Sequence, residues 1–205
     1  FLPKTVAAYR DEHPAVTFDL QRQSGEEAEH ALRSLEVDLA LIFEPIKSMD
    51  FQTIVTARQQ LHCIMAVDHP LAEKAAIRLR DCSGQAAVLP CADSGVRQLL
   101  NVGLISRNTE LRIVAESNNQ EFLHNYLTQE PVISFQIPIA LPPGMIENVG
   151  GVNNVVARPV DLSDVPAGIL HVGQLKGRVL PVAAAKFLDT ITTELSNRYS
   201  DDFDQ

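Results

Sequence analysis

Apolar runs of strand length alternate with amphipathic stretches of helix length along most of the chain. Residues 61–67 form a mainly apolar run, which is typical of a strand buried on both faces of a sheet. Pro70 follows soon after, and proline ends a strand because it has no N–H to donate to a neighbour. The run therefore predicts a core strand that leaves one lobe of the protein and enters a second.

Ahead of this run, helix and strand patterns alternate. Apolar residues at helical spacing predict a helix over residues 3–12. An alternating apolar and polar pattern predicts a strand with one dry face at 16–21. Ser24 is expected to cap a second helix, and residues 37–43 are expected to form a buried strand. This order predicts a largely parallel sheet covered by helices. The buried stripe of the second helix would consist of Ala28, Leu32 and Leu35.

The same alternation resumes after Pro70. Asn118 and Glu121 have capping-box spacing, which predicts a helix start there. Pro181 opens a last helix with apolar residues on one face. The remaining expected elements are strands at 86–90, 111–116, 131–138, 155–160 and 168–172, and helices at 95–103 and 120–129.

Composition narrows the function. The chain has 205 residues, of which 45% are hydrophobic and 21% charged, enough for one large domain or two small ones. Its net charge is −9, which argues against direct binding of nucleic acid or of an anionic membrane surface, because such binding relies on Lys and Arg. No apolar run reaches transmembrane length, and the first residues lack the pattern of a signal peptide.

The three cysteines are an odd number and form no C-x-x-C pair. Cys63 falls in the core strand, where a buried thiol is expected. This usage fits a reducing compartment and predicts a cytoplasmic protein, with a Cys82–Cys91 disulfide as the alternative.

A set of short motifs extends over nearly the whole chain in a familiar order. They are Phe1-Leu2-Pro3 with Tyr9 and His13-Pro14, Val37-Asp38-Leu39-Ala40, Asp68-His69-Pro70-Leu71-Ala72, Ile77-Arg78-Leu79-Arg80-Asp81, Ser94-Gly95-Val96-Arg97 and Val114-Ala115-Glu116-Ser117-Asn118. Together they resemble the effector-binding domain of LysR-type transcriptional regulators.

The resemblance implies an α/β fold like that of type 2 periplasmic binding proteins, with two Rossmann-like lobes joined by two crossover strands. Lobe I would comprise residues 1–67 plus 168–205, and lobe II residues 68–167. The resemblance also implies a homodimer or tetramer that contacts DNA only through an N-terminal winged helix-turn-helix, which this chain does not contain. The family's domain opens with a strand ahead of its first helix, whereas this chain begins at the helix.

Ligands of open α/β sheets bind outside the carboxyl ends of the strands. Several of these ends lead into helices, whose first N–H groups attract anions, so a small carboxylate effector is expected in the crevice. The alternatives to binding an acid are structural roles or a different ligand. The polar residues would only cap helices, Phe135 would belong to the core, and Glu44 would hold an amine or pair with Arg97. The candidate ligand-binding residues are Ser24, Phe43, Glu44, Ser94, Gly95, Ser117, Asn118 and Phe135.

Three function classes are weighed. The first is the effector-sensing domain of a LysR-type regulator, which signals through dimer geometry. The second is a solute-binding protein of a transporter with the same fold. The third is an enzyme, which is disfavoured because the chain holds no G-x-S-x-G, Walker, G-x-G-x-x-G or H-E-x-x-H motif. No cofactor or metal is expected, since His62 and Cys63 are adjacent in a strand and point to opposite faces.

Pairing of two copies is the last expectation. The resemblance suggests an antiparallel dimer, and helix 3–12 carries apolar residues such as Val6 and Tyr9 in more than one direction. Helix 120–129 of a second copy would supply Phe122 and Tyr126 as partners.

Overall fold

The chain forms two compact units in a computed structural model that describes residues 1–142, 144–146 and 151–199. Unit 1 comprises residues 1–58 and 169–205, and unit 2 comprises residues 59–168. The strand at 62–66 belongs to unit 2, because it is paired on both sides by strands of that unit.

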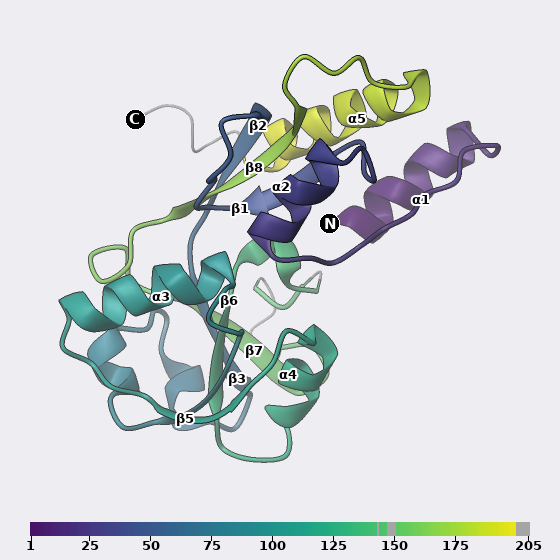
Figure 1. The fold of residues 1–205 in the computed structure, drawn as a ribbon. Helices are drawn as coiled ribbons and strands as arrows, with labels where there is room; N and C mark the ends of the chain where they lie inside the picture. The colour runs from purple at the N-terminus through teal and green to yellow at the C-terminus, as the bar shows by residue number, and fades with distance from the viewer. Residues whose placement is uncertain (143, 147–150, 200–205) are drawn as a thin grey trace. The chain divides into compact units, whose positions relative to one another are not determined.

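Unit 1 is built on a three-stranded sheet with the strand order β1-β8-β2 (Figure 1). Strand β1 pairs with β8 in antiparallel fashion, so this sheet is not the parallel one that was expected. Its elements are α1 (Leu2–Glu12), α2 (Gly25–Arg33), β1 (Ala40–Phe43), β2 (Phe51–Gln59), β8 (Gly168–Leu175) and α5 (Val182–Arg198).

Two apolar groups hold unit 1 together. Leu32 of α2 packs with Ala40 and Ile42 of β1. The rings of Tyr9 and Phe18 meet that of Phe187 on α5, with centroids 5.2 and 4.7 Å from the Phe187 ring. This ring cluster joins α1 to α5, the first and last helices of the unit.

Two sequence predictions for unit 1 are wrong, and one strand was missed. Residues 16–21 form no strand ladder within the described part of the chain, because no strand lies beside them to exchange hydrogen bonds. Leu35, expected in a buried stripe, is 58% exposed and has a φ of 62°, since α2 has already ended at Arg33. Strand β2 was not predicted, because much of its length is exposed and carries polar residues.

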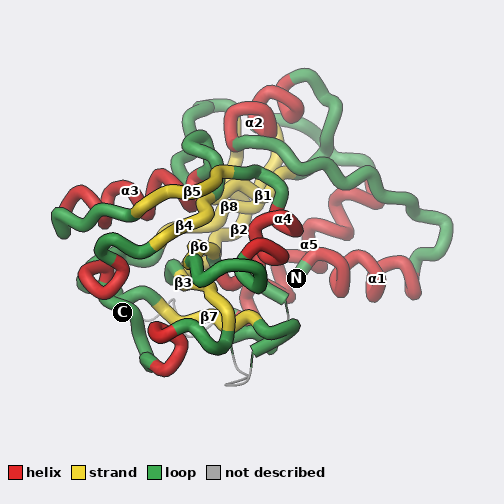
Figure 2. Tube along the Cα trace, turned by 90° about the horizontal axis from the view of Figure 1, so that it is seen from below, coloured by secondary structure: helices red, strands yellow, loops and turns green. Residues whose placement is uncertain are grey.

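Unit 2 is built on a five-stranded mixed sheet with the order β5-β4-β6-β3-β7. Strand β4 is parallel to β5 and β6, and β3 is antiparallel to β6 and β7. Figure 2 shows these strands as one stack in yellow, with α3 and α4 lying outside it. The elements are β3 (His62–Ala66), β4 (Ala86–Leu89), α3 (Gly95–Ser106), β5 (Arg112–Glu116), α4 (Gln120–Tyr126), β6 (Ile133–Gln136) and β7 (Val155–Pro159).

Three short 3-10 turns complete unit 2, at Pro70–Glu73, Leu79–Cys82 and Pro138–Ala140. The first explains the Asp-His-Pro-Leu-Ala motif. His69 is its N-cap, and the ring Nδ1 accepts the N–H of Leu71. Burial lowers the pKa of His69, which favours the neutral ring that this cap requires. The motif therefore terminates the core strand and starts the next segment.

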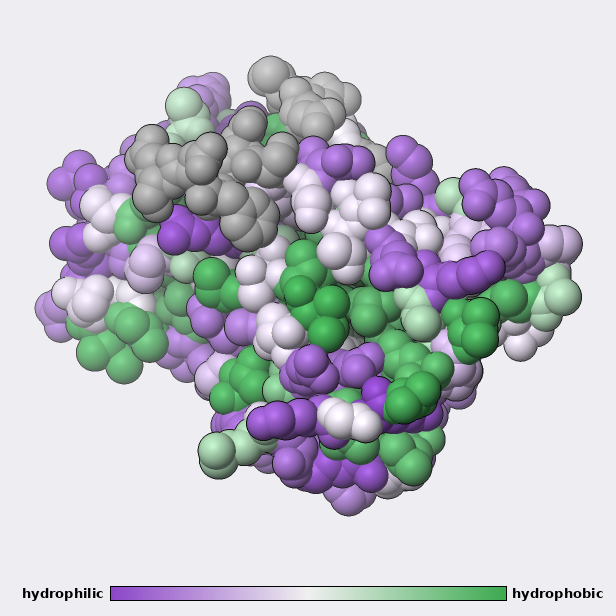
Figure 3. Space-filling model, turned by 90° about the horizontal axis from the view of Figure 1, so that it is seen from above, coloured by the Kyte–Doolittle hydropathy of each residue, from purple (hydrophilic) through white to green (hydrophobic). Residues whose placement is uncertain are grey.

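Two observations describe how apolar residues are distributed over the described part of the chain. Figure 3 shows that, on the face it presents, hydrophobic residues lie in separate groups with hydrophilic residues between them. Among the described residues, no helix is both long and apolar enough to cross a membrane.

Candidate functional site

The N-terminus of α3 lies at one edge of the unit 2 sheet. Ser94 is the N-cap of this helix, but its hydroxyl makes no capping bond to the described residues, and Gly95 is the first helical residue. The backbone places Ser94 through its own N–H, which donates to the Cys91 carbonyl at 3.0 Å. The hydroxyl and the first N–H groups of α3 are therefore available to an anion.

Ser117 and Asn118 follow β5 at the same edge. Because β4 and β5 are parallel, with Leu89 paired to Glu116, the loops that follow them lie side by side. The Ser117 N–H donates to the Leu89 carbonyl at 3.0 Å. Asn118 is exposed and does not cap α4. Asn119 does so instead, with its Oδ1 accepting the Phe122 N–H at 3.1 Å, so the predicted capping box with Glu121 is wrong.

Arg97 fixes the geometry of this edge. Its side chain is almost fully buried and donates to the Pro90 carbonyl at 3.1 Å and to Asn101 at 3.0 Å. It also forms an ion pair with Glu116 at the end of β5. Arg97 was expected, as one alternative, to pair with Glu44. Its partner is instead Glu116, which belongs to the same unit. This positioning role was not predicted from the sequence. The feature that could have indicated it is an arginine in the first turn of a helix, where basic residues are unfavourable unless they have a partner.

Phe135 lies in the middle of the unit 2 sheet on β6 and has no exposed surface. Its neighbours Ser134 and Gln136 are also buried, and the Ser134 hydroxyl has no hydrogen-bond partner among the described residues. Phe135 thus occupies a core position, which was the alternative to a role in ligand binding.

In unit 1, Ser24 has the capping role. Its hydroxyl accepts the Glu27 N–H, and the Glu27 carboxylate accepts the Ser24 N–H at 2.8 Å. Each residue thus accepts the N–H of the other, which is a capping box. The bonds to Ser24 also lower the pKa of Glu27. The Ser24 hydroxyl also donates to the same carboxylate at 2.9 Å, which leaves it little capacity for a ligand.

Phe43 and Glu44 lie at the end of β1. Phe43 is half-buried and pairs with Leu170. The Glu44 carboxylate accepts the Ile169 N–H at 2.9 Å, and the Glu44 N–H donates to the Ile169 carbonyl at 3.0 Å. One carboxylate oxygen of Glu44 is therefore engaged with the backbone of β8.

A cavity of about 520 Å³ lies elsewhere in unit 1. Its lining includes residues 16–23 and 36–41, together with Phe187 and Ile191 of α5. None of the three unit 1 candidates lines this cavity. It lies where residues 16–21 lack a neighbouring strand.

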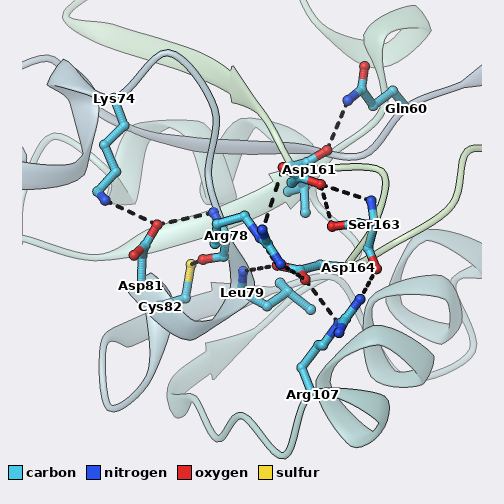
Figure 4. A network of polar contacts seen from close by, with 11 residues as sticks. Gln60, Lys74, Arg78, Leu79, Asp81, Cys82, Arg107, Asp161, Ser163 and Asp164 are labelled. Atoms are coloured by element: carbon cyan, nitrogen blue, oxygen red, sulfur yellow. Dashed lines mark hydrogen bonds and ion pairs between the residues drawn. The ribbon is translucent and has the colours of Figure 1, made fainter.

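A polar network fixes the end of unit 2 (Figure 4). Arg78 donates twice to the Asp164 carboxylate at 2.8 Å, and the Leu79 N–H donates at 2.9 Å. Arg107 forms a further ion pair with Asp164 at 2.9 Å. Hydrogen bonds from Arg78 lower the pKa of Asp164 to about 2, so the carboxylate is charged at neutral pH.

Several of the histidines and cysteines are buried. No group of three or more His, Cys, Asp or Glu side chains there could hold a metal ion. His62 is buried beside the Gln60 carbonyl, and burial lowers its pKa. Cys63, Cys82 and Cys91 are free thiols, and burial raises the pKa of Cys63 well above its usual value, which suppresses its reactive thiolate form.

The family model for the LysR substrate binding domain matches residues 1–196. The chain belongs to the LysR substrate-binding domain family. Relatives of this domain include the Hca operon transcriptional activator HcaR of Escherichia coli (strain K12), which is 23% identical over 198 residues. The transcriptional dual regulator GltC of Bacillus subtilis (strain 168) is 24% identical over 164 residues.

These comparisons cover 96% and 69% of the present chain. The chain spans 64% of the length of HcaR and 52% of the length of GltC. Both relatives are named as transcriptional regulators. Membership of the LysR substrate-binding domain family therefore supports an effector-binding domain over the solute-binding protein of a transporter.

Solved structures have the same fold. The effector-binding domain of QuiR in complex with shikimate aligns with a TM-score of 0.77 at 18% identity, covering 97% of this chain and 91% of that one. The regulatory domain of CcmR of Synechocystis PCC6803 in complex with 2-PG aligns with a TM-score of 0.78 at 22% identity, covering 96% and 92%. The predicted periplasmic-binding-protein-like fold class is confirmed.

Proposed function

We propose that this domain senses a small organic acid and regulates transcription in the cytoplasm as part of a longer DNA-binding protein. The observation that carries the choice of ligand is the start of α3. The Ser94 hydroxyl makes no capping bond to the described residues, and a helix N-terminus favours a carboxylate. Ser117 follows β5, the strand that is parallel to β4. Its hydroxyl oxygen accepts the Asn119 N–H, and its own hydrogen is proposed as a second donor to the ligand.

The proposed contacts in unit 2 are Ser94, Gly95, Ser117 and Asn118. The acid would accept hydrogen bonds from the Ser94 hydroxyl and the α3 N–H groups. In unit 1, Phe43 would offer an apolar contact, and Glu44 would accept a hydrogen bond from a hydroxyl or amine of the effector. Ser24 and Phe135 are left out, because their side chains already serve as cap and core.

The relatives support an acidic ligand and a multidomain regulator. The QuiR domain was solved with shikimate, which carries a carboxylate, and full-length CbnR was solved with its target DNA. We infer that DNA binding here is the task of a winged helix-turn-helix in the rest of the protein, since the domain itself has a net charge of −9.

A thermal-shift screen against a panel of small carboxylic acids tests the proposal, because a ligand that binds the folded state raises Tm. In Ser94→Ala, the acid that stabilises the wild-type domain should bind about tenfold more weakly, with little change in the ligand-free Tm. Ser24→Ala is the matched control. It should lower the ligand-free Tm through the lost cap and leave affinity unchanged.

Two outcomes would contradict this assignment. One is an acid that binds Ser94→Ala as tightly as wild type, which would move the site away from α3. The other is a panel in which only neutral or cationic compounds raise Tm, which would exclude an organic acid.

We also propose a homodimer or a tetramer built from it. Tyr9 is excluded from its interface because it is core, 5% exposed, with its hydroxyl donating to the Ala183 carbonyl. Val6 of α1 remains half-buried, and Phe122 of α4 is 42% exposed beside Tyr126. Sedimentation should therefore detect a dimer that weakens in Phe122→Glu. A clean monomer at tens of micromolar would defeat the proposal.

A further inference from the structure

A histidine ring holds the start of the 3-10 turn that follows β3. The turn spans Pro70–Glu73 and begins at its N-cap, His69, which is 5% exposed. The His69 Nδ1 accepts the Leu71 N–H at 3.2 Å. Pro70 has no N–H, so Leu71 supplies the first backbone donor of the turn. Leu71 is buried, so the loss of this bond would leave a buried donor without its partner.

The bond to Leu71 fixes the protonation state of the ring. A backbone N–H can only donate, and an imidazole nitrogen accepts only when it carries no hydrogen. The His69 ring is therefore neutral, with its hydrogen on Nε2. A protonated ring carries hydrogens on both nitrogens, so it would direct one N–H at another. Protonation of His69 and capping of Leu71 exclude each other.

The second side-chain attachment of the turn does not titrate. Arg158 of β7 donates from Nε to the Ala72 carbonyl at 2.9 Å, and from Nη1 to the Ala157 carbonyl at 3.1 Å. An arginine keeps its charge at every pH that a folded protein meets. Acid therefore acts on the start of the turn, whereas Ala72 stays bound to β7.

The other charged or titratable groups of this corner are exposed or distant along their strand. The turn packs against β3 and β7. On β3 the titratable residues are His62 and Cys63, at the end of the strand away from the turn. On β7 the charged residue is Arg158. The charged residues of the segment itself are exposed, and they are Asp68, Glu73 and Lys74.

Burial sets the direction of the pH effect. Desolvation of the ring lowers the pKa of His69 from its usual value of about 6.5, and the Asp68 carboxylate acts in the opposite direction. The folded chain thus favours the neutral ring that Leu71 requires. The stability that comes from this bond is complete above about pH 6.5, and it is lost as the pH falls through the pKa of folded His69.

We propose that His69 is an acid-sensitive latch on the corner between β3 and Lys74. At neutral pH the ring holds the Leu71 N–H. Protonation releases that N–H, and residues 68–71 open locally while the strands of the sheet stay paired. The device lies wholly within unit 2 and does not depend on the identity of the effector.

Amide hydrogen exchange, resolved by residue with NMR, tests the latch on the ligand-free domain. The protection factor of the Leu71 amide, which corrects for the intrinsic effect of pH on exchange, should fall about tenfold or more between about pH 7 and about pH 5. The Ile64 amide, in the middle of β3, should keep its protection. His69→Asn is the matched control, because its side-chain oxygen can accept the same N–H and does not titrate. In this variant the Leu71 protection factor should stay constant over the same range.

Nitrogen NMR of the ring gives a second readout that needs no variant. At neutral pH the Nδ1 resonance should be that of a nitrogen without hydrogen, and a ring with its hydrogen on Nδ1 overturns the proposal. The proposal also fails if the Leu71 amide keeps its full protection at about pH 5. It fails equally if the loss at Leu71 is shared by Ile64, which would mean general unfolding, or is as large in His69→Asn.

Discussion

The two units respond differently to the same kind of sequence pattern. In unit 2, the strands β3, β4 and β6 each lie between two neighbours, and nearly all of their residues are buried. In unit 1, β1 has four residues at a sheet edge, and the alternating segment 16–21 has joined no sheet. The difference teaches that apolar alternation specifies a strand only where a neighbouring strand exists to pair with it.

The largest expected effect concerns the two cores. Phe135→Ala removes a fully buried ring in the unit 2 sheet and should cost about 3–5 kcal/mol of unfolding free energy. Phe18→Ala removes a half-buried ring in unit 1 and should cost roughly 1–2 kcal/mol. Urea unfolding followed by circular dichroism is the measurement, since the chain has no tryptophan. Equal losses would show that unit 1 is as tightly packed as unit 2.

The next effect concerns buried charge. Asp164 is bound by Arg78 and Arg107 in unit 2, whereas the Asp38–Arg178 pair of unit 1 leaves the Asp38 side chain 44% exposed. Asp164→Asn should cost about 2 kcal/mol, and the matched change Asp38→Asn less than about 1 kcal/mol.

The pH dependence of stability sharpens this prediction. The pKa of Asp164 is about 2 in the folded chain, below the unfolded value of about 3.9. Its contribution is therefore complete above about pH 4 and is lost as the pH falls toward 2. Over that window the wild-type protein should lose about 1–2 kcal/mol more than Asp164→Asn. If the unfolding free energy of both proteins falls equally with pH over this window, the lowered pKa of Asp164 in the folded chain is refuted.

The smallest effect concerns how two helices end. Leu35 after α2 has a φ of 62°, and Asn108 after α3 has a φ of 48°. Asparagine adopts this conformation at a lower energetic cost than leucine does. Leu35→Gly should therefore stabilise the protein by about 0.5 kcal/mol, and Asn108→Leu should destabilise it by about 1 kcal/mol. Thermal unfolding resolves both, and a lower Tm for Leu35→Gly would mean that the leucine makes contacts worth more than its strain.

Much of the fold follows from sequence because its elements are locally specified. Ser24 with Glu27, and Pro3 at the start of α1, mark helix starts by their own chemistry. Strands β3, β4 and β6 could be predicted because each lies in a mainly apolar run of strand length. By contrast, β2 is largely exposed, so its pairing depends on β8, which lies more than a hundred residues later in the sequence.

The candidate site could be predicted only in outline. Strand ends located Ser94 and Ser117 correctly at one edge of a sheet. The residue three positions later separates the two serines: Glu27 completes a capping box with Ser24, whereas Arg97 follows Ser94 and cannot do so. The choice between Asn118 and Asn119 as cap depends on where the turn after β5 ends.

The segment at 16–21 has a practical consequence for handling the protein. Proteases bind their substrates as extended strands, and this mostly exposed segment belongs to no helix or strand ladder that would hold it back. Arg22 follows directly and is exposed. Brief trypsin treatment should therefore cut after Arg22 before it cuts within the paired strands of unit 2. The two fragments would remain associated through the ring cluster of Tyr9, Phe18 and Phe187, and the nicked protein would separate only under denaturing conditions.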